Sequence, residues 1–249
     1  MEIAGKTKFK RVLIKLTGEF LSKEGEKGIN FHEVDKVAQG ILEIKQRTGS
    51  QMAIVVGGGN LMRGRDIADS DVDRAVADYI GSLGTVMNGL ALEESLNRLS
   101  GDSRKAVLLT ALPISAVAEP FYRKRALKHL DSDKIVVLGG GTGNPFFTTD
   151  SAAALRAAEL KCEVILKGST IDGIYTADPK KDPTARKYKY LTYQTALEKK
   201  LEVMDNNAFA ICQRENIPIL VFQAEDLGSI LSGEKVGTMV SNRPDEFFE

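Results

Sequence analysis

Six short, mostly apolar and often β-branched runs recur along the 249-residue chain, and they constrain its fold more than any other feature. They cover 11–16, 51–56, 105–110, 134–138, 163–167 and 218–222. They do not alternate between apolar and polar residues, which is typical of strands buried on both faces of a parallel sheet. Segments with helical patterning separate them, at 32–48, 74–99, 151–160, 192–200 and 204–215. This order predicts an α/β fold, a three-layer αβα sandwich around a mostly parallel sheet.

The length suits one compact domain, since single cores stop growing near about 250–300 residues. We expect a last strand at 235–241 to close one edge of the sheet, and the polar, acidic tail at 242–249 to fray. The 34 basic and 34 acidic residues give a formal net charge of zero. This balance removes any bulk electrostatic reason to expect binding to nucleic acid or to a membrane surface.

The cysteines and histidines do not indicate a metal site or a nucleophile. Cys162 and Cys212 lack partners at metal-ligand spacing and are typical of buried thiols in a reducing cytosol. His32 and His129 lie in polar stretches of helical character and are expected at the surface. No stretch approaches the ~20 apolar residues of a membrane span, and the basic N-terminus lacks a signal-peptide core. We therefore expect a cytoplasmic protein.

Lysines stand at the carboxyl ends of two runs, where ligands bind in parallel α/β sheets. Lys15 is followed by Leu-Thr-Gly, and Lys167 by Gly-Ser-Thr. An ammonium group near a buried strand is costly to desolvate unless it reaches solvent or meets an anion. One such lysine can be structural, but two in equivalent positions favour an anion site.

Glycine clusters follow two further runs, at 57–59 and 139–141. Asn60 and Arg63 follow the first cluster, and a stretch rich in hydroxyl and amide groups, 142–150, follows the second. Backbone N–H groups in such clusters can form a concave nest for phosphate oxygens, and a following helix adds a favourable dipole. Together with the two lysines and Arg63, the clusters predict a phosphate-binding edge.

The common phosphate-binding motifs are missing from the sequence. Gly228 and Gly233 have the spacing of a P-loop, but Glu234 stands where that motif requires lysine. Met62 stands where a dinucleotide-binding G-x-G-x-x-G would need its third glycine. The protein-kinase signatures are also absent. These absences exclude the P-loop and Rossmann readings, and with them a dinucleotide oxidoreductase.

Phosphoryl transfer is chemistry that such an edge can support, because it needs in-line positioning and cations around the migrating group. Lys15 and Lys167 can supply charge from opposite sides of the sheet edge, aided by Arg63 and Mg²⁺. Asp150 can hold both ammonium groups or cap the helix that follows it, and both roles stay open. An acceptor phosphate that is ionised at pH 7 needs no general base.

The segment 172–179 contains Asp-Gly and Asp-Pro turn signals after the Lys167 run. It is either a solvated loop or part of a nucleotide site. In the second case Tyr175 would offer a platform for adenine, and Asp178 would accept hydrogen bonds from ribose hydroxyls.

Taken together, these residues resemble the amino-acid-kinase fold family, most closely its bacterial uridylate (UMP) kinase branch, from about residue 10 to 241. The matching runs are KLTGE at 15–19, GGGNLMRG at 57–64, TVMNGLAL at 85–92, GTGNPFFTTD at 141–150, DGIYTADP at 172–179 and VMD at 203–205. The resemblance implies transfer of the γ-phosphoryl of MgATP to UMP, in pyrimidine nucleotide biosynthesis. It also implies a homohexamer, with GTP as activator and UTP as inhibitor in many members.

The resemblance assigns roles residue by residue. Contacts to ATP fall on Lys15, Leu16, Thr17, Gly18, Gly59, Arg63, Ser169, Tyr175 and Asp178. Contacts to UMP fall on Gly58, Asp78, Thr142, Gly143, Asn144, Pro145, Phe146, Phe147, Thr148 and Thr149. The catalytic set is Lys15, Lys167, Arg63 and Asp150, with Asp205 as a further organiser, and magnesium is expected on the ATP phosphates. The UMP lobe would cover about 1–160 and the ATP lobe 161–242, before a polar tail at 243–249.

Two departures and two alternatives accompany this reading. Thr17 stands where the family usually has serine, and Gly168-Ser169-Thr170 replaces a commoner Ala-Thr-Lys pattern. One alternative is a non-catalytic nucleotide-binding or storage module, which would not need both lysines and Asp150. The other is a kinase whose acceptor is an amino acid or carbamate, which the 141–150 segment disfavours.

Overall fold

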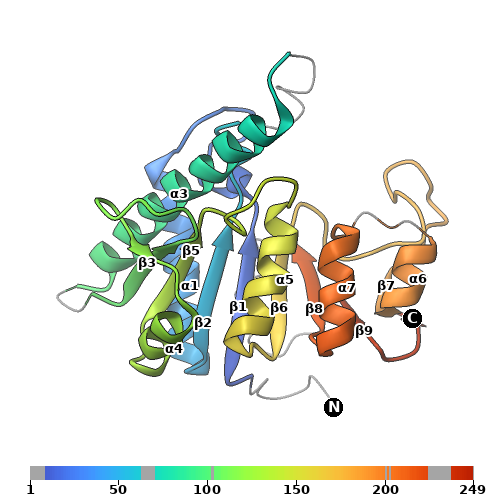
Figure 1. The fold of residues 1–249 in the computed structure, drawn as a ribbon. Coiled ribbons are helices and arrows are strands. Elements are labelled where there is room, and N and C mark those ends of the chain that lie inside the picture. The colour runs from blue at the N-terminus through green and yellow to red at the C-terminus, as the bar shows by residue number, and fades with distance from the viewer. Residues whose placement is uncertain are drawn as a thin grey trace.

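The computed structural model describes residues 9–62, 71–101, 104–199, 201, 203–223 and 237–248. Within these residues one ten-stranded sheet has the order β10-β7-β9-β8-β6-β1-β2-β5-β3-β4. Helices cover both of its faces (Figure 1). The α/β sandwich predicted from the sequence is therefore confirmed.

The six predicted strands form the centre of the sheet and run parallel to one another. They are β1 (Arg11–Leu16), β2 (Gln51–Val56), β3 (Ala106–Thr110), β5 (Ile135–Gly139), β6 (Val164–Ser169) and β8 (Ile219–Gln223). Their continuous apolar character arises because alternate side chains enter two cores. In β1, Leu13 packs into one core, whereas Val12 and Ile14 pack into the other.

Each helical layer supplies one of these cores. α1 (Phe31–Thr48) and α3 (Arg74–Leu99) contribute the apolar residues of one, and α4 (Arg123–Asp131), α5 (Thr149–Leu160), α6 (Tyr193–Glu198) and α7 (Asn206–Glu215) those of the other. A short 3₁₀ helix, η1 (Gly18–Leu21), follows β1. The helix α4 lies outside the five predicted segments. Its buried residues are Ala126 and Leu130, too few for a clear helical pattern.

The two ends of the sheet differ from the prediction. β9 (Thr238–Ser241) lies between β8 and β7 (Tyr188–Thr192), so the last predicted strand does not close an edge, and 235–236 lie outside the described residues. The edge strands are the two-residue β4 (Glu119–Pro120) and β10 (Glu246–Phe247).

The tail that was predicted to fray is, at β10, part of the sheet. β10 pairs antiparallel with β7, and the Phe247 ring stacks on Tyr188 with centroids 4.5 Å apart. Burial of the aromatic ring against Tyr188 offsets the polar composition of the segment.

The two cysteines are buried as expected, and one of the two histidines is not at the surface as expected. Cys162 and Cys212 are free, buried thiols, and burial raises the pKa of each to about 12. His32 is exposed, whereas His129 is partly buried and lies 3.2 Å from a Glu119 carboxylate oxygen. In the described part of the chain, no helix combines the length and apolarity that crossing a membrane requires.

Candidate active site

Lys15 and Lys167 are register partners in the neighbouring parallel strands β1 and β6. Partners in parallel strands point to the same face of a sheet, so the two ammonium groups do not approach from opposite sides, as predicted, but from one. Both reach the carboxylate of Asp150 at the start of α5. Lys15 Nζ lies 2.8 Å from Oδ1, and Lys167 Nζ lies 2.9 Å from Oδ2.

The local geometry at the start of α5 decides between the two roles left open for Asp150. Thr148 is the N-cap, because its hydroxyl accepts hydrogen bonds from the backbone N–H groups of Asp150 and Ser151. The capping role predicted for Asp150 is therefore wrong. Its carboxylate is left to pair with the lysines, and the contact with both ammonium groups is confirmed.

The three charged groups are largely buried, with side-chain exposures of 10% for Lys15, 17% for Asp150 and 13% for Lys167. Burial by itself would raise the pKa of Asp150, but the charges of the two lysines outweigh it and hold that pKa below its ordinary value. Burial lowers the pKa of Lys167, and the opposing charge of Asp150 does not fully restore it. The two ammonium groups share one contacting carboxylate, and two cations held side by side in this way suit a phosphate.

Asp205 organises this corner from the side of α7. Its carboxylate caps α7 by accepting from Ala208 N at 2.9 Å, and it also accepts from the Ser151 hydroxyl at 2.9 Å and from the Thr148 hydroxyl. It thereby ties the beginnings of α5 and α7 together. Lys167 also donates to the carbonyl of Val203, just before this cap. The contacts are those of a positioning residue.

The loops after β1 and β2 approach each other closely because glycines line their contact. A Cβ on Gly18 would lie 2.3 Å from Asn60 Oδ1 and 2.7 Å from the carbonyl oxygen of Gly57. Asn60 and Asn88 exchange amide hydrogen bonds of 2.7 and 3.2 Å, and Asn88 Nδ2 also donates to Gly57 O at 2.7 Å. This amide pair fixes the loop 57–60 after β2, the glycine loop, to α3.

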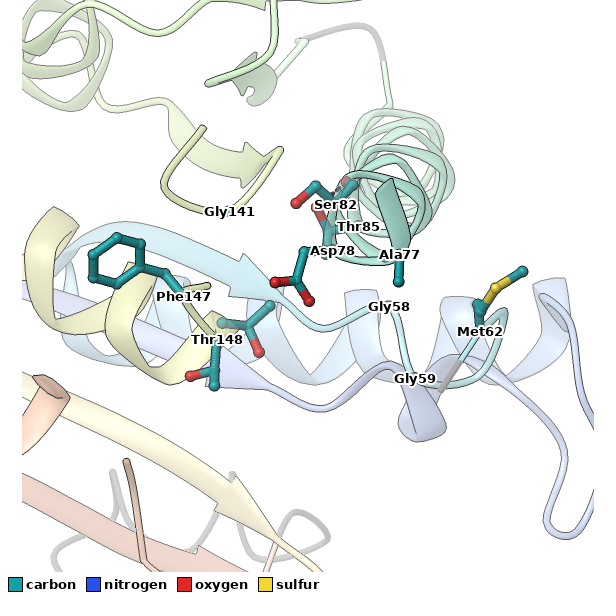
Figure 2. A pocket seen from close by; sticks show the side chains of 12 residues that line it. Gly58, Gly59, Met62, Ala77, Asp78, Ser82, Thr85, Gly141, Phe147 and Thr148 are labelled. Atoms are coloured by element: carbon teal, nitrogen blue, oxygen red, sulfur yellow. Dashed lines mark hydrogen bonds between the residues drawn. The ribbon is translucent and has the colours of Figure 1, made fainter. Parts of the chain in front are cut away.

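A hollow between α3, the glycine loop and the start of α5 adjoins these loops (Figure 2). We call it the α3 hollow. It is lined by Gly58, Gly59, Met62, Ala77, Asp78, Gly81, Ser82, Thr85, Gly141, Phe147, Thr148 and Thr149. The Asp78 carboxylate lies between α3 and the segment that carries Phe147 and Thr148 (Figure 2). Its Oδ2 accepts from Phe146 N at 2.7 Å, and its Oδ1 from Arg74 Nε at 3.1 Å.

The α3 hollow contains five of the residues predicted to hold UMP: Gly58, Asp78, Phe147, Thr148 and Thr149. The five residues directly before Phe147 on its loop are outside the lining: Thr142, Gly143, Asn144, Pro145 and Phe146. Phe146 adopts a left-handed backbone (φ 69°) and is 63% exposed, an uncommon state for an aromatic residue.

The sequence analysis missed several lining residues, among them Ser82 and Thr85. Thr85 is buried and its hydroxyl accepts from Gly140 N at 2.8 Å, so it joins α3 to the second glycine cluster. The run TVMNGLAL contains Thr85 and Asn88, and that match was the available signal.

The predicted ATP-side residues fall in two places. Leu16, Thr17 and Gly18 follow Lys15 from the end of β1 to the start of η1, where Gly18 approaches Gly57 and Asn60. Gly59 lines the α3 hollow, whereas Ser169 ends β6 and Tyr175 and Asp178 lie beyond it. The Tyr175 hydroxyl donates to Asp172 Oδ1 at 2.9 Å, and Asp178 Oδ1 accepts from Lys180 N in a turn. Arg63 lies outside the described residues. Within the described ranges, no group of three acidic, histidine or cysteine side chains is placed to hold a metal ion.

The chain is similar to known proteins along nearly its whole length. A UMP kinase from Bacillus anthracis matches with a TM-score of 0.91 and 36% identity, over 97% of this chain and 99% of that chain. A UMP kinase from Ureaplasma parvum gives 0.85 and 35%, over 94% and 99%. A uridylate kinase from Archaeoglobus fulgidus gives 0.70 and 30%, over 92% and 99%. A model of the amino acid kinase family matches residues 10–223, and with that extent of agreement the chain belongs to this family.

Proposed function

We propose that the protein is a UMP kinase, which transfers the γ-phosphoryl of MgATP to UMP and forms ADP and UDP. The observation that carries the proposal is the pair of buried lysines held on Asp150 beside the α3 hollow. The similarity to solved UMP kinases along nearly the whole chain supports it. The place of the reaction is then pyrimidine nucleotide biosynthesis in the cytoplasm.

In this proposal the chain contributes charge and position. The acceptor phosphate is already ionised at pH 7, so no side chain needs to remove a proton from it. Lys15 and Lys167 stabilise the negative charge on the oxygens of the migrating phosphoryl group, aided by Arg63. Asp150 keeps the two ammonium groups apart and oriented before substrates arrive. Magnesium enters with ATP, as MgATP.

We further propose that the chain divides into two substrate sides. Residues up to about 160 supply the α3 hollow and would hold UMP. Residues 161–242 supply β6 and the segment with Tyr175 and Asp178, and would hold ATP together with Lys15 to Gly18 and Gly59. The phosphoryl group would then pass between the two sides, at the lysines.

The test of the proposal is ADP release from MgATP with one acceptor at a time: UMP, CMP, AMP, GMP, glutamate, aspartate or carbamate. We expect ADP with UMP above all others. ADP formed with an amino acid or carbamate would keep the phosphoryl chemistry and overturn the acceptor. ATP binding without ADP release from any acceptor would overturn catalysis in favour of a storage or regulatory module.

Replacement of Asp78 tests the acceptor side. Asp78→Ala should raise the KM for UMP about 10- to 100-fold, the effect of one lost hydrogen bond to a charged group, while kcat changes little. Glu94→Ala, at an exposed position further along α3, is the control and should leave both constants unchanged. A kcat/KM for Asp78→Ala within twofold of the wild type would show that the site is assigned wrongly.

We also extend the proposal to the assembly, a homohexamer activated by GTP and inhibited by UTP. Support for self-association comes from α3, where an exposed apolar stripe runs along one face. It consists of Val76, Tyr79, Leu83, Met87 and Leu90, each 42–54% exposed. Spacings of three and four residues place these side chains on one side of the helix, and a stripe of this kind marks an interaction surface.

A charge placed in this stripe should disrupt the assembly. Leu83→Glu is expected to shift the molar mass, measured by light scattering after size exclusion, from an oligomer to a smaller species. Val117→Glu, at a 47% exposed apolar position outside the stripe, should keep the wild-type mass. An unchanged mass for Leu83→Glu would contradict association through α3. Adding GTP or UTP to the ADP assay tests the two effectors.

A further inference from the structure

The C-terminal segment 243–248 is fixed to the protein by several independent contacts, and neither the fold prediction nor the proposed chemistry explains them. Asp245 accepts from Thr192 N and from the Thr195 hydroxyl, each at 2.7 Å, at the start of α6. β10 pairs with β7, and Phe248 N donates to Lys187 O at 3.2 Å. We call this segment the C-terminal clasp.

The clasp contacts β7 and the two residues before it through aromatic rings. Phe247 stacks on Tyr188, and the Arg186 guanidinium lies 4.1 Å from the centroid of the Phe247 ring. Lys187 Nζ lies 5.2 Å from the Phe248 centroid. Stacks and cation–π contacts of this geometry restrict the side chains that they join.

Arg186 and Lys187 belong to a hairpin, 172–188, that begins shortly after β6. Tyr175 and Lys187 form an antiparallel bridge, Thr176 N donates to Arg186 O at 3.0 Å, and Tyr188 N donates to Ile174 O at 2.8 Å. These bonds join the two arms of the hairpin, and one of the arms is the one that the clasp contacts.

Lys187 extends the connection to the side chains of the hairpin. Its Nζ donates to Asp172 Oδ2 at 2.7 Å, and Asp172 Oδ1 accepts from the Tyr175 hydroxyl at 2.9 Å. Burial would raise the pKa of Asp172, but the hydrogen bonds from Lys187 and Tyr175 outweigh it and lower that pKa. Contacts therefore run without a gap from Phe248 through Lys187 and Asp172 to Tyr175.

We propose that the C-terminal clasp is a positioning segment for the ATP side of the site, acting through Arg186 and Lys187 on the hairpin that carries Tyr175 and Asp178. The inference rests on the proposed function, because that function places ATP at this hairpin. The contacts of the clasp described above reach β7, the beginning of α6 and the residues next to the hairpin, so we expect it to act on ATP and not on UMP.

The first test is kinetic. Phe247→Ala should raise the KM for MgATP about tenfold, the factor that loss of one stack and one cation–π contact allows, with the KM for UMP unchanged. Tyr122→Ala, which removes an exposed ring under Arg125 elsewhere on the surface, is the matched control and should change neither constant. A clasp that only stabilised the fold would lower the Tm and leave the ATP constant as it was. A parallel rise in both KM values would also overturn the inference.

A double-mutant cycle tests the route. If the clasp acts through Lys187 on Asp172, the effects of Phe248→Ala, which removes the ring beside Lys187, and of Asp172→Asn on the KM for MgATP should be less than additive in free energy. Full additivity would show that the two act separately and would overturn the route.

Two measurements without turnover separate this inference from the proposed function. In Phe247→Ala, the amide protons of Thr176 and Tyr188 should exchange with deuterium about tenfold faster, whereas those of β1 and β2 should not change. The affinity for a fluorescent ATP analogue should fall by a similar factor. A protein that binds the analogue but phosphorylates no UMP would refute the proposed kinase and leave the clasp standing. Unchanged exchange in the hairpin, or unchanged affinity for the analogue, would refute the clasp.

Discussion

Lys15→Met is expected to lower kcat for UDP formation by about 10²-fold or more, with a smaller change in either KM. The variant removes one of two charges that face the migrating phosphoryl group, and preorganised charge of this kind acts mainly in the transition state. Methionine nearly fills the space of the lysine stem. Asp150 still pairs with Lys167, so the variant should fold.

Lys45→Met is the matched control for that experiment. Lys45 is also a buried lysine, paired with Asp133, and it donates to the Ser50 carbonyl just before β2, at the opposite end of that strand from the glycine loop. Its loss should lower stability and leave kcat unchanged. Equal losses of kcat in the two variants would mean that Lys15 serves the fold alone. A kcat/KM within twofold of the wild type for Lys15→Met would refute its catalytic role.

Asp150→Asn is expected to have the largest effect on stability. It leaves two largely buried ammonium groups without a counter-charge, and breaking a buried ion pair in this way costs about 3–5 kcal/mol. For a chain of this size the Tm should fall by about 10 °C. Asp131→Asn is the control: its ion pair with Arg11 is solvent-exposed on the aspartate side (64%), and its loss should cost at most about 1 kcal/mol. A Tm for Asp150→Asn equal to that of the control would contradict the stabilising role of Asp150 between the two lysines.

The pH dependence of stability should change in the same variant. In the wild type the pKa of Asp150 is lowered on folding, so its stabilisation is complete above about pH 4, the unfolded value, and is lost as the pH falls through the folded value. Asp150→Asn should lack this acid-side loss. The pKa of Lys167 is also lowered on folding, although the charge of Asp150 opposes that shift, so the folded state releases this proton first as the pH rises. Asp150→Asn removes the opposing charge and should therefore gain more stability at alkaline pH than the wild type. Denaturant titrations between pH 3 and pH 10 would measure both trends.

A residue that was out of place in its own surroundings gave the clearest signal in the sequence. One lysine in a buried apolar run can be structural, but Lys15 and Lys167 in equivalent positions predicted an anion site, and the structure shows that both contact Asp150. The parallel sheet could be predicted for a related reason, since burial on both faces leaves a continuous apolar run. The strand β7 could not be predicted in this way, because only Tyr188 and Leu191 of its five residues are buried.

Elements and contacts that depend on distant partners carried no such signal. Asp78 sits on a helix surface like many carboxylates, and its partner Phe146 is 68 residues away. The pairing of Asn60 with Asn88 spans 28 residues and involves two ordinary amides. β10 has two residues and is held by Tyr188, Tyr190 and Arg186, none of which its own sequence reveals.

Because Lys15 and Lys167 are register partners, the backbone positions from which their side chains start are fixed relative to each other. Adjacent strands lie about 4.8 Å apart, and that spacing is set by the backbone ladder, which ligands do not alter. The two lysine side chains therefore leave the sheet at a fixed separation. Any movement that brings the substrates together for phosphoryl transfer must therefore be made by the nucleotides and by the segments that carry them.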